Sequence, residues 1–243
     1  MIDLRHGDCL ELMSGIPDKS VDLILCDLPY DKTACKWDII IPFEQLWEQY
    51  TRIIKDNGAI VLFGSEPFSS LLRISNIKRY KYDWYWNKTT STNFLNAKKQ
   101  PLRNVETISV FYSKQPTYNP QKSYGHKRKV SLINHKLNCR MTDIYGQHGL
   151  TSYDSTERYP TQILLYKTDK QKQALHPTQK PVALLEYLIK TYTNEGEIVL
   201  DNCMGSGSTG VACVRTNRNF IGMELDERYF NIAKERIESE IDK

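Results

Sequence analysis

The feature that most constrains the fold is a glycine-rich segment that directly follows a short apolar run. Residues 198–200 are apolar, and the chain continues through Gly205-Ser206-Gly207-Ser208-Thr209-Gly210, which matches the pattern G-x-G-x-x-G. This pattern is typical of a turn that joins a buried strand to a helix and lets backbone approach a nucleotide-like ligand. The segment therefore predicts an α/β fold with a ligand-binding turn near its C-terminal end.

The rest of the chain alternates short apolar runs with helical patterns. Buried strands are expected in four runs bounded by Gly, Asp or Asn: 21–26, 59–63, 197–200 and 220–223. Helices are expected where apolar residues recur at helical spacing: 43–54 after Pro42, 182–189 after Pro181, 208–216, and a last helix capped by Asp226. Such alternation predicts a mostly parallel sheet, with antiparallel partners at 80–86 and 107–112 along one edge.

A second chemical motif, Asp27-Leu28-Pro29-Tyr30, follows the predicted strand at 21–26. An exocyclic amino group of adenine or cytosine is a poor nucleophile because its lone pair is delocalised into the ring. The Asp27 carboxylate and the Leu28 carbonyl can each accept one N–H, and Tyr30 can stack on the base. The alternative is an ordinary turn around Pro29 at a strand end.

Asp201 narrows the choice of ligand at the glycine-rich turn. A phosphate-binding P-loop is disfavoured because no Lys follows Gly210. A nicotinamide cofactor remains an alternative, although Asp201 would lie near its pyrophosphate. S-adenosylmethionine carries an ammonium group and no phosphate, so it suits an acidic turn better. Glu224, at the end of the next predicted strand, can accept hydrogen bonds from ribose hydroxyls, or it is only a solvated acid.

Positive charge is concentrated in the middle of the chain. Residues 96–142 contain ten basic residues and one acid, Glu106, which leaves 23 basic and 28 acidic residues elsewhere among the chain's 33 and 29. A basic segment on an acidic body suits a polyanionic partner such as DNA, whereas the alternative is a solvated, inert loop. Residues 115–175 lack clear periodicity, so a recognition insertion is expected there.

Size and cysteine content fit one intracellular domain with an insertion. The 243 residues can bury one substantial core, and no apolar run approaches the length of a membrane span, so a cytoplasmic protein is expected. The six cysteines form no C-x-x-C pair. Neither a zinc site nor a disulfide framework is therefore predicted, and no metal is needed.

Taken together, the motifs resemble those of bacterial and phage amino-methyltransferases of DNA, in the permuted "beta" group. Asp27-Leu28-Pro29-Tyr30 is similar to the family's D-P-P-Y motif, and the segment 201–209 is similar to its D-P-F-x-G-S-G-T-T loop. Three further segments resemble family motifs: His176-Pro177-Thr178-Gln179-Lys180-Pro181 (H-P-T-Q-K-P), Trp86-Asn87-Lys88 (W-x-K) and the strand at 106–114. The resemblance covers most of the chain.

The resemblance implies a Rossmann-like methyltransferase sheet in circularly permuted order. Residues 1–114 would form the catalytic half, 115–175 the target-recognition insertion with a basic surface beginning near 96, and 176–243 the cofactor half. The implied reaction transfers a methyl group from S-adenosylmethionine to an amino group in double-stranded DNA. Asp in the first motif position implies adenine N6, with cytosine N4 as the alternative. Two alternatives from other functional classes stay open: a nicotinamide-dependent oxidoreductase and a catalytically inactive DNA-binding module.

The resemblance also implies the site residues. Asp27, Leu28, Pro29 and Tyr30 would be catalytic. Cofactor binding is implied for ten residues: Asp8, Thr178, Lys180, Asp201, Asn202, Cys203, Gly205, Ser206, Gly207 and Glu224. Backbone at 178–180 would line the methionine end, and Asp8 would lie near the cofactor adenine or cap a helix. Leu28 replaces a family Pro, and Asn202 and Cys203 replace Pro and Phe.

Overall fold

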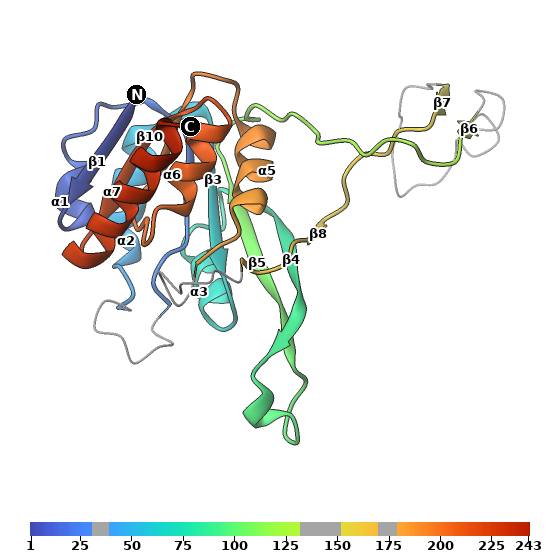
Figure 1. Cartoon of the computed structure of the whole chain (residues 1–243), viewed down its shortest axis with the longest axis horizontal. Coiled ribbons are helices and arrows are strands. Elements are labelled where there is room, and N and C mark those ends of the chain that lie inside the picture. Colours follow the sequence, from blue (N-terminus) through green and yellow to red (C-terminus); the bar gives the residue numbers. More distant parts are fainter. Residues whose placement is uncertain (31–38, 132–151, 170–178) are drawn as a thin grey trace. The chain divides into compact units, whose positions relative to one another are not determined.

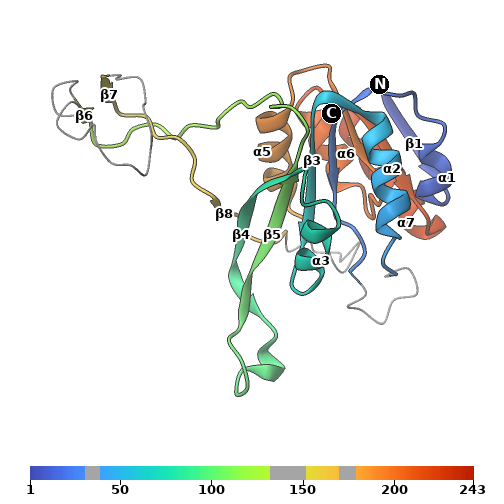
Figure 2. The same cartoon turned by 180° about the vertical axis from the view of Figure 1, so that it is seen from behind.

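The computed structural model describes residues 1–30, 39–131, 152–169 and 179–243 (Figures 1 and 2). These residues divide into two compact units. Met1–Asn119 and Gln162–Lys243 form the first unit, and Pro120–Thr161 form the second. The Asp27-Leu28-Pro29-Tyr30 motif and the glycine-rich turn both belong to the first unit.

Within the described residues, the first unit contains an eight-stranded sheet in the order β1-β10-β9-β2-β3-β5-β4-β8. Its strands are β1 (Ile2–His6), β2 (Val21–Cys26), β3 (Ile54–Gly64), β4 (Tyr80–Thr92), β5 (Arg103–Phe111), β8 (Ile163–Leu165), β9 (Ile198–Asp201) and β10 (Asn219–Glu224). The strands from β1 to β3 in this order are parallel, whereas β5 runs antiparallel to both β3 and β4. The predicted mostly parallel sheet with an antiparallel edge is confirmed.

Helices cover both faces of this sheet. They are α1 (Cys9–Met13), α2 (Phe43–Ile53), α3 (Phe68–Ser75), α5 (Val182–Tyr192), α6 (Ser208–Arg215) and α7 (Glu227–Ile241), with a short 3₁₀ turn, η1 (Phe94–Asn96). Apolar residues of α5, α6 and α7 share one core cluster with Leu23 and Leu25 of β2. Those of α1, α2 and α3 share the other with Ile24 and Cys26. Side chains of β2 therefore enter both cores, which explains why its sequence is almost uniformly apolar.

The structure corrects several predicted boundaries. Helix α2 ends at Ile53, and Ile54 begins β3, which is longer than the predicted strand at 59–63. Strand β1 was not predicted, although Ile2 and Leu4 alternate with Asp3 and Arg5; it pairs in parallel with β10. Strand β8 lies inside the segment 115–175, which lacks clear periodicity, and it pairs with β4. The predicted N-cap at Asp226 is confirmed, since its side chain accepts from the Tyr229 N–H.

The second unit contains a small antiparallel pair, β6 (Lys129–Ser131) and β7 (Tyr153–Ser155). Arg128 donates to both carboxylate oxygens of Asp154 at 2.7 and 2.5 Å. Lys127 and Lys129 are exposed, and within the described part of this unit neither forms an ion pair. Part of the basic segment is therefore internally neutralised, and part is open to solvent.

None of the helices in the described residues is both long enough and apolar enough to cross a membrane.

Candidate active site

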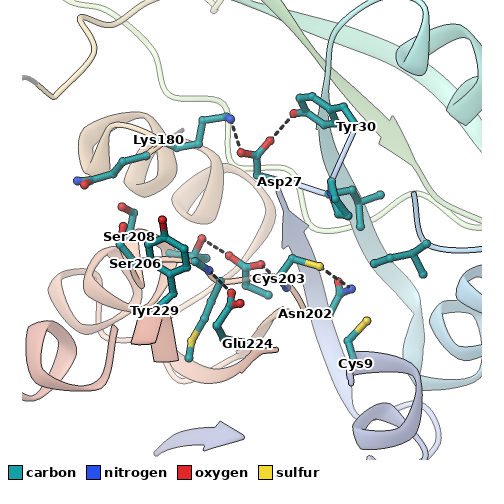
Figure 3. A pocket seen from close by; sticks show the side chains of 18 of the residues that line it. Cys9, Asp27, Tyr30, Lys180, Asn202, Cys203, Ser206, Ser208, Glu224 and Tyr229 are labelled. Carbon is teal, nitrogen blue, oxygen red and sulfur yellow. Dashed lines mark hydrogen bonds and ion pairs between the residues drawn. The ribbon is translucent and has the colours of Figure 1, made fainter. Parts of the chain in front are cut away.

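Three acidic residues meet at one edge of the sheet because they end neighbouring parallel strands. Asp27 directly follows β2, while Asp201 ends β9 and Glu224 ends β10; β9 lies between β2 and β10. All three line a cavity of about 940 Å³ in the first unit. Figure 3 shows Asp27 on one side of this cavity, with Glu224 and residues of the glycine-rich turn on the other. The carboxyl edge of an open α/β sheet is the usual place for a ligand site.

Both carboxylate oxygens of Asp27 are hydrogen-bonded. The Tyr30 hydroxyl donates to Oδ1, and the Lys180 ammonium donates to Oδ2 (Figure 3). The Tyr30 ring packs against Phe68 with a centroid distance of 4.8 Å. Leu28 buries its side chain in the core and lines the cavity too. The motif thus fixes a carboxylate and an aromatic ring at one wall.

Asp27 belongs to a group of four charged side chains at the cavity wall, of which Lys180 is buried and the other three are half-buried. The Lys180 Nζ is 3.6 Å from Oε2 of Glu106, and Lys88 donates to Oε1 of the same carboxylate. Two carboxylates and two ammonium groups therefore compensate one another. Burial raises the pKa of Asp27 above its usual range, against the opposing effect of Lys180. Burial also raises the pKa of Glu106, but Lys180 and Lys88 outweigh it and lower that pKa overall.

Lys180 itself stays charged in this setting. Burial lowers the pKa of its ammonium, but the carboxylates of Asp27 and Glu106 outweigh burial and raise the pKa above the usual value. Backbone at 178–180 was expected along the cofactor, and this stays a prediction; the Lys180 side chain donates to the Asp27 carboxylate. Thr178, expected beside it, lies outside the described residues. The neighbouring Gln179 lines the cavity, and its buried Nε2 has no hydrogen-bond partner among the described residues.

The glycine-rich turn is held from within by Asp201. Its Oδ1 accepts from the Cys203 N–H at 3.1 Å, and its Oδ2 accepts from the Thr209 hydroxyl at 2.6 Å. Asp201 is only 3% exposed, and burial raises its pKa to about 6. The Asp201 carboxylate thus organises the turn while it lines the cavity, and its contact with a cofactor ammonium stays a prediction.

Glycine is required at position 207 for two reasons. Gly207 has a φ of 77°, which L side chains rarely adopt, and a Cβ there would lie 2.9 Å from Cβ of Ala233 in α7. Helix α7 also reaches the turn through Arg236, whose Nη1 donates to the Ser206 carbonyl and the Ser208 hydroxyl, both at 3.0 Å. The turn therefore rests directly against α7.

Glu224 and Asp8 face the cavity from two further elements. Oε2 of Glu224 accepts from the Gly205 N–H and Oε1 from the Asp226 N–H, both at 2.9 Å. Burial raises the pKa of Glu224. Asp8 caps α1 by accepting from the Leu10 N–H at 2.8 Å, and it also lines the cavity. The two interpretations offered for Asp8 are therefore compatible.

Asn202 and Cys203 occupy the positions where the family pattern has Pro and Phe. Oδ1 of Asn202 accepts from the Tyr50 hydroxyl at 2.6 Å, which ties the turn to α2. Cys203 also lines the cavity, and Nδ2 of Asn202 lies 3.5 Å from its sulfur. A polar contact thus anchors the turn to the helix layer at this point.

Sequence reasoning did not assign Glu106 and Lys88 to the site, although both lay within quoted motifs. They come from β5 and β4, and their strands pair through Trp86↔Glu106. Both strands contain other charged residues, Lys81 and Asp83 in β4 and Arg103 in β5, so the sequence pattern alone did not single out this pair.

Comparison with known proteins identifies the family. The model of a DNA methylase family, N6_N4_Mtase, matches residues 21–235. The chain is 29% identical to the DNA adenine methyltransferase YhdJ of Escherichia coli (strain K12), over 96% of the chain and 81% of that protein. It is 27% identical to the type II methyltransferase M2.DpnII of Streptococcus pneumoniae, over 98% and 90% respectively.

Solved structures agree with this assignment. A crystal structure of the M1.HpyAVI–SAM complex has a TM-score of 0.68 and 26% identity, and the match covers 98% of this chain and 99% of that one. The PvuII DNA methyltransferase (cytosine-N4-specific) also has a TM-score of 0.68, covering 99% and 91%, but at 16% identity it supports the fold alone. Since the family model spans most of the chain, including both motifs that meet at the cavity, the protein belongs to the N6_N4 family of DNA methylases.

Proposed function

We propose that this protein transfers a methyl group from S-adenosylmethionine to the N6 amino group of an adenine in double-stranded DNA. The observation that carries the proposal is the shared cavity, into which the Asp27 segment and the glycine-rich turn both open. Its volume of about 940 Å³ is at the upper end of ligand pockets, which suits a cofactor together with a base. The family assignment sets aside the nicotinamide alternative.

The cavity has the donors and acceptors that S-adenosylmethionine requires. Each Glu224 oxygen accepts one backbone N–H and retains a lone pair for a ribose hydroxyl. The buried amide of Gln179 offers an N–H without a partner among described residues. Asp8, Asp201, Asn202, Cys203, Gly205 and Ser206 complete this side of the cavity. Thr178 and Gly207 are further expected contacts. When bound, the cofactor supplies an electrophilic methyl carbon attached to sulfur.

Asp27 would prepare the amino group for attack. Its carboxylate and the Leu28 carbonyl each accept one N–H, which orients the nitrogen lone pair toward the methyl carbon. Because the motif's second residue acts through its backbone, Leu can replace Pro, and its buried side chain anchors that carbonyl. The proton that the nitrogen loses once it is methylated would pass to this carboxylate or to solvent. Tyr30, backed by Phe68, offers a stacking face to the base.

A base inside duplex DNA must leave the stack to reach this cavity. Flipping costs a few kcal/mol, and stacking on Tyr30 offsets about 1 to 3 kcal/mol of it. The insertion around 115–175 is the proposed target-recognition region, in which Lys127 and Lys129 offer exposed positive charge. Phosphate contacts of this kind position a duplex without reading its bases.

Tritium-labelled S-adenosylmethionine and DNA from a methylation-free host provide the test. The wild-type protein should label this DNA, and Asp27→Ala should lose nearly all transfer while retaining cofactor and DNA affinity, because the carboxylate acts on the reacting nitrogen. Thermal-shift measurements with S-adenosylmethionine and with NAD provide the binding control. Stabilisation by NAD alone, or normal turnover by Asp27→Ala, would contradict the proposal.

A further inference from the structure

The hairpin formed by β4 and β5 connects the active-site cavity to an exposed tip. Alternate residues of β4 line the cavity: Trp86, Lys88, Thr90 and Thr92. Glu106 of β5 lines it as well. Beyond Thr92 the chain enters η1, and the hairpin projects away from the helix-covered part of the sheet (Figures 1 and 2). The hairpin therefore runs from the cavity wall to a tip that begins directly after Thr92.

Two large apolar side chains stand at this tip without cover from the rest of the first unit. Phe94 is 76% exposed and Leu95 is 85% exposed. The turn that presents them is ordered by its own hydrogen bonds. Asn96 Nδ2 donates to Asn93 Oδ1 at 2.8 Å, and the Lys99 N–H donates to the Asn96 carbonyl at 2.8 Å. Adjacent exposed apolar residues on an ordered turn indicate a contact surface.

The charge around the tip indicates the chemistry of its partner. Between Asp83 and Glu106 the sequence contains no acid. Lys98, Lys99 and Arg103 are exposed, and in the described parts of the chain none of the three forms an ion pair. An apolar pair surrounded by unpaired cations is complementary to a polyanion with an apolar interior, which describes a DNA duplex better than it describes a second copy of this chain.

We propose that the hairpin tip is a wedge that enters the duplex beside the target base. Phe94 and Leu95 would occupy the stack next to the gap left by the flipped base, and Lys98, Lys99 and Arg103 would contact the flanking phosphates. This inference rests on the proposed function. It adds a base-opening role for residues outside the catalytic motif and outside the cofactor-binding turn.

The test compares a paired target with one that is already unpaired. Sequencing the modified DNA of an expressing host provides the methylated site, which is placed in a synthetic duplex; a second duplex has an abasic site opposite the target adenine. Phe94→Ala/Leu95→Ala should lower kcat/KM on the paired duplex by roughly ten- to a hundredfold, as expected for a lost stacking contact. Most of the activity should return on the abasic duplex, where opening costs less.

Matched variants separate the wedge from a general loss of apolar surface. Ile74→Ala/Ile77→Ala removes two similarly exposed residues, at 71% and 62%, and should leave kcat/KM unchanged on both duplexes. Phe94→Tyr, which keeps an aromatic ring, should retain activity on paired DNA. Thermal stabilisation by S-adenosylmethionine should be the same in every variant, because these side chains lie outside the cavity lining.

Four outcomes would overturn the wedge. An equal loss on the paired and abasic duplexes would assign the tip to general binding, and no loss on either would make it inert. Conversion of a wild-type dimer to a monomer by Phe94→Ala/Leu95→Ala in sedimentation, with both duplexes equally affected, would assign the tip to self-association. Wild-type inactivity on both duplexes would overturn the proposed function, and the wedge with it.

Discussion

Lys180 and Asp27 lie 153 positions apart in the chain, yet the Lys180 ammonium donates a hydrogen bond to Oδ2 of the Asp27 carboxylate. Lys180 immediately precedes the Pro181 cap of α5, and Asp27 immediately follows β2. The contact thus joins two distant segments of the first unit, one on each side of the second unit in sequence. It also places a buried positive charge, itself 8% exposed, against the group proposed to act on the base.

Replacing Lys180 by Met should weaken catalysis more than cofactor binding. Burial raises the pKa of Asp27 and Lys180 opposes this rise, so removing the ammonium should raise that pKa further. The acid limb of the kcat profile should move to higher pH, with a loss of about a hundredfold at pH 7 and partial recovery in more alkaline buffer. The profile of kcat against pH is the measurement.

Two control variants accompany this experiment. Lys180→Arg retains the positive charge and should keep the wild-type acid limb with a smaller loss of kcat. Lys190→Met removes an exposed lysine of α5 that pairs with Glu186 and should change nothing. An unshifted acid limb in Lys180→Met would show that the ammonium does not control ionisation of Asp27.

Asp201 should make stability depend on pH in an unusual direction. Its pKa in the folded protein is about 6, above the unfolded value near 3.8, so the folded protein binds this proton more tightly. The ionised form therefore costs about 3 kcal/mol above pH 6, and this cost falls as pH decreases from 6 toward 3.8. Asp201→Asn should lack this pH-dependent cost, because the amide does not ionise. Urea unfolding should show the stability advantage of the Asn variant shrinking by about 1 kcal/mol between pH 7 and pH 5, and a constant advantage would contradict the assignment.

Arg236 should influence cofactor affinity without contacting the target base of the DNA. Its guanidinium holds Ser206 and Ser208 from α7, so Arg236→Gln should loosen the turn and weaken S-adenosylmethionine binding by about tenfold, the value of roughly one hydrogen bond to a charged group. Isothermal titration gives the affinity, and saturating cofactor should restore kcat. Lys234→Gln on the same helix is the exposed control. A loss of kcat that persists at saturation would place Arg236 in the reaction itself.

The ion pair between Arg128 and Asp154 predicts that the residues of the basic cluster 127–129 contribute unequally to DNA binding. Lys127→Gln/Lys129→Gln should flatten the slope of log K against log salt by about 2, at about 0.9 per phosphate contact. Arg128→Gln should change the slope less, because Asp154 already competes for its guanidinium. Asp154→Asn should release Arg128 and steepen the slope. Equal effects of Arg128 and its two neighbours would show that DNA displaces Asp154.

The sequence was sufficient where function depends on local pattern. The apolar run of β2, the turn at Gly205–Gly207 and the Asp226 cap each follow from a few adjacent residues, and each is present. The sequence was insufficient where one element runs directly into the next. Ile54 continues the helical spacing of α2 but begins β3, because its backbone pairs with Val21 in the sheet.

The electrostatics of the site could be predicted only in part. Asp27, Tyr30 and Glu224 were expected at the cavity and line it or border it. Pairing of Lys180 with Asp27 and Glu106 depends on three segments meeting in space, which neither periodicity nor motif spacing encodes. Asp201 was predicted to face the cofactor, and this stays a prediction: the residue lines the cavity, and its carboxylate also accepts hydrogen bonds from Cys203 and Thr209.

The identity of the modified base is the decisive test of the proposed methylation of adenine N6. DNA from a methylation-free host that expresses the protein is digested to nucleosides and analysed by mass spectrometry, beside DNA from a host that expresses Asp27→Ala. We predict N6-methyladenine with the wild-type protein and none with the variant. N4-methylcytosine without N6-methyladenine would contradict the assignment of the base, and equal N6-methyladenine from both proteins would contradict the role of Asp27.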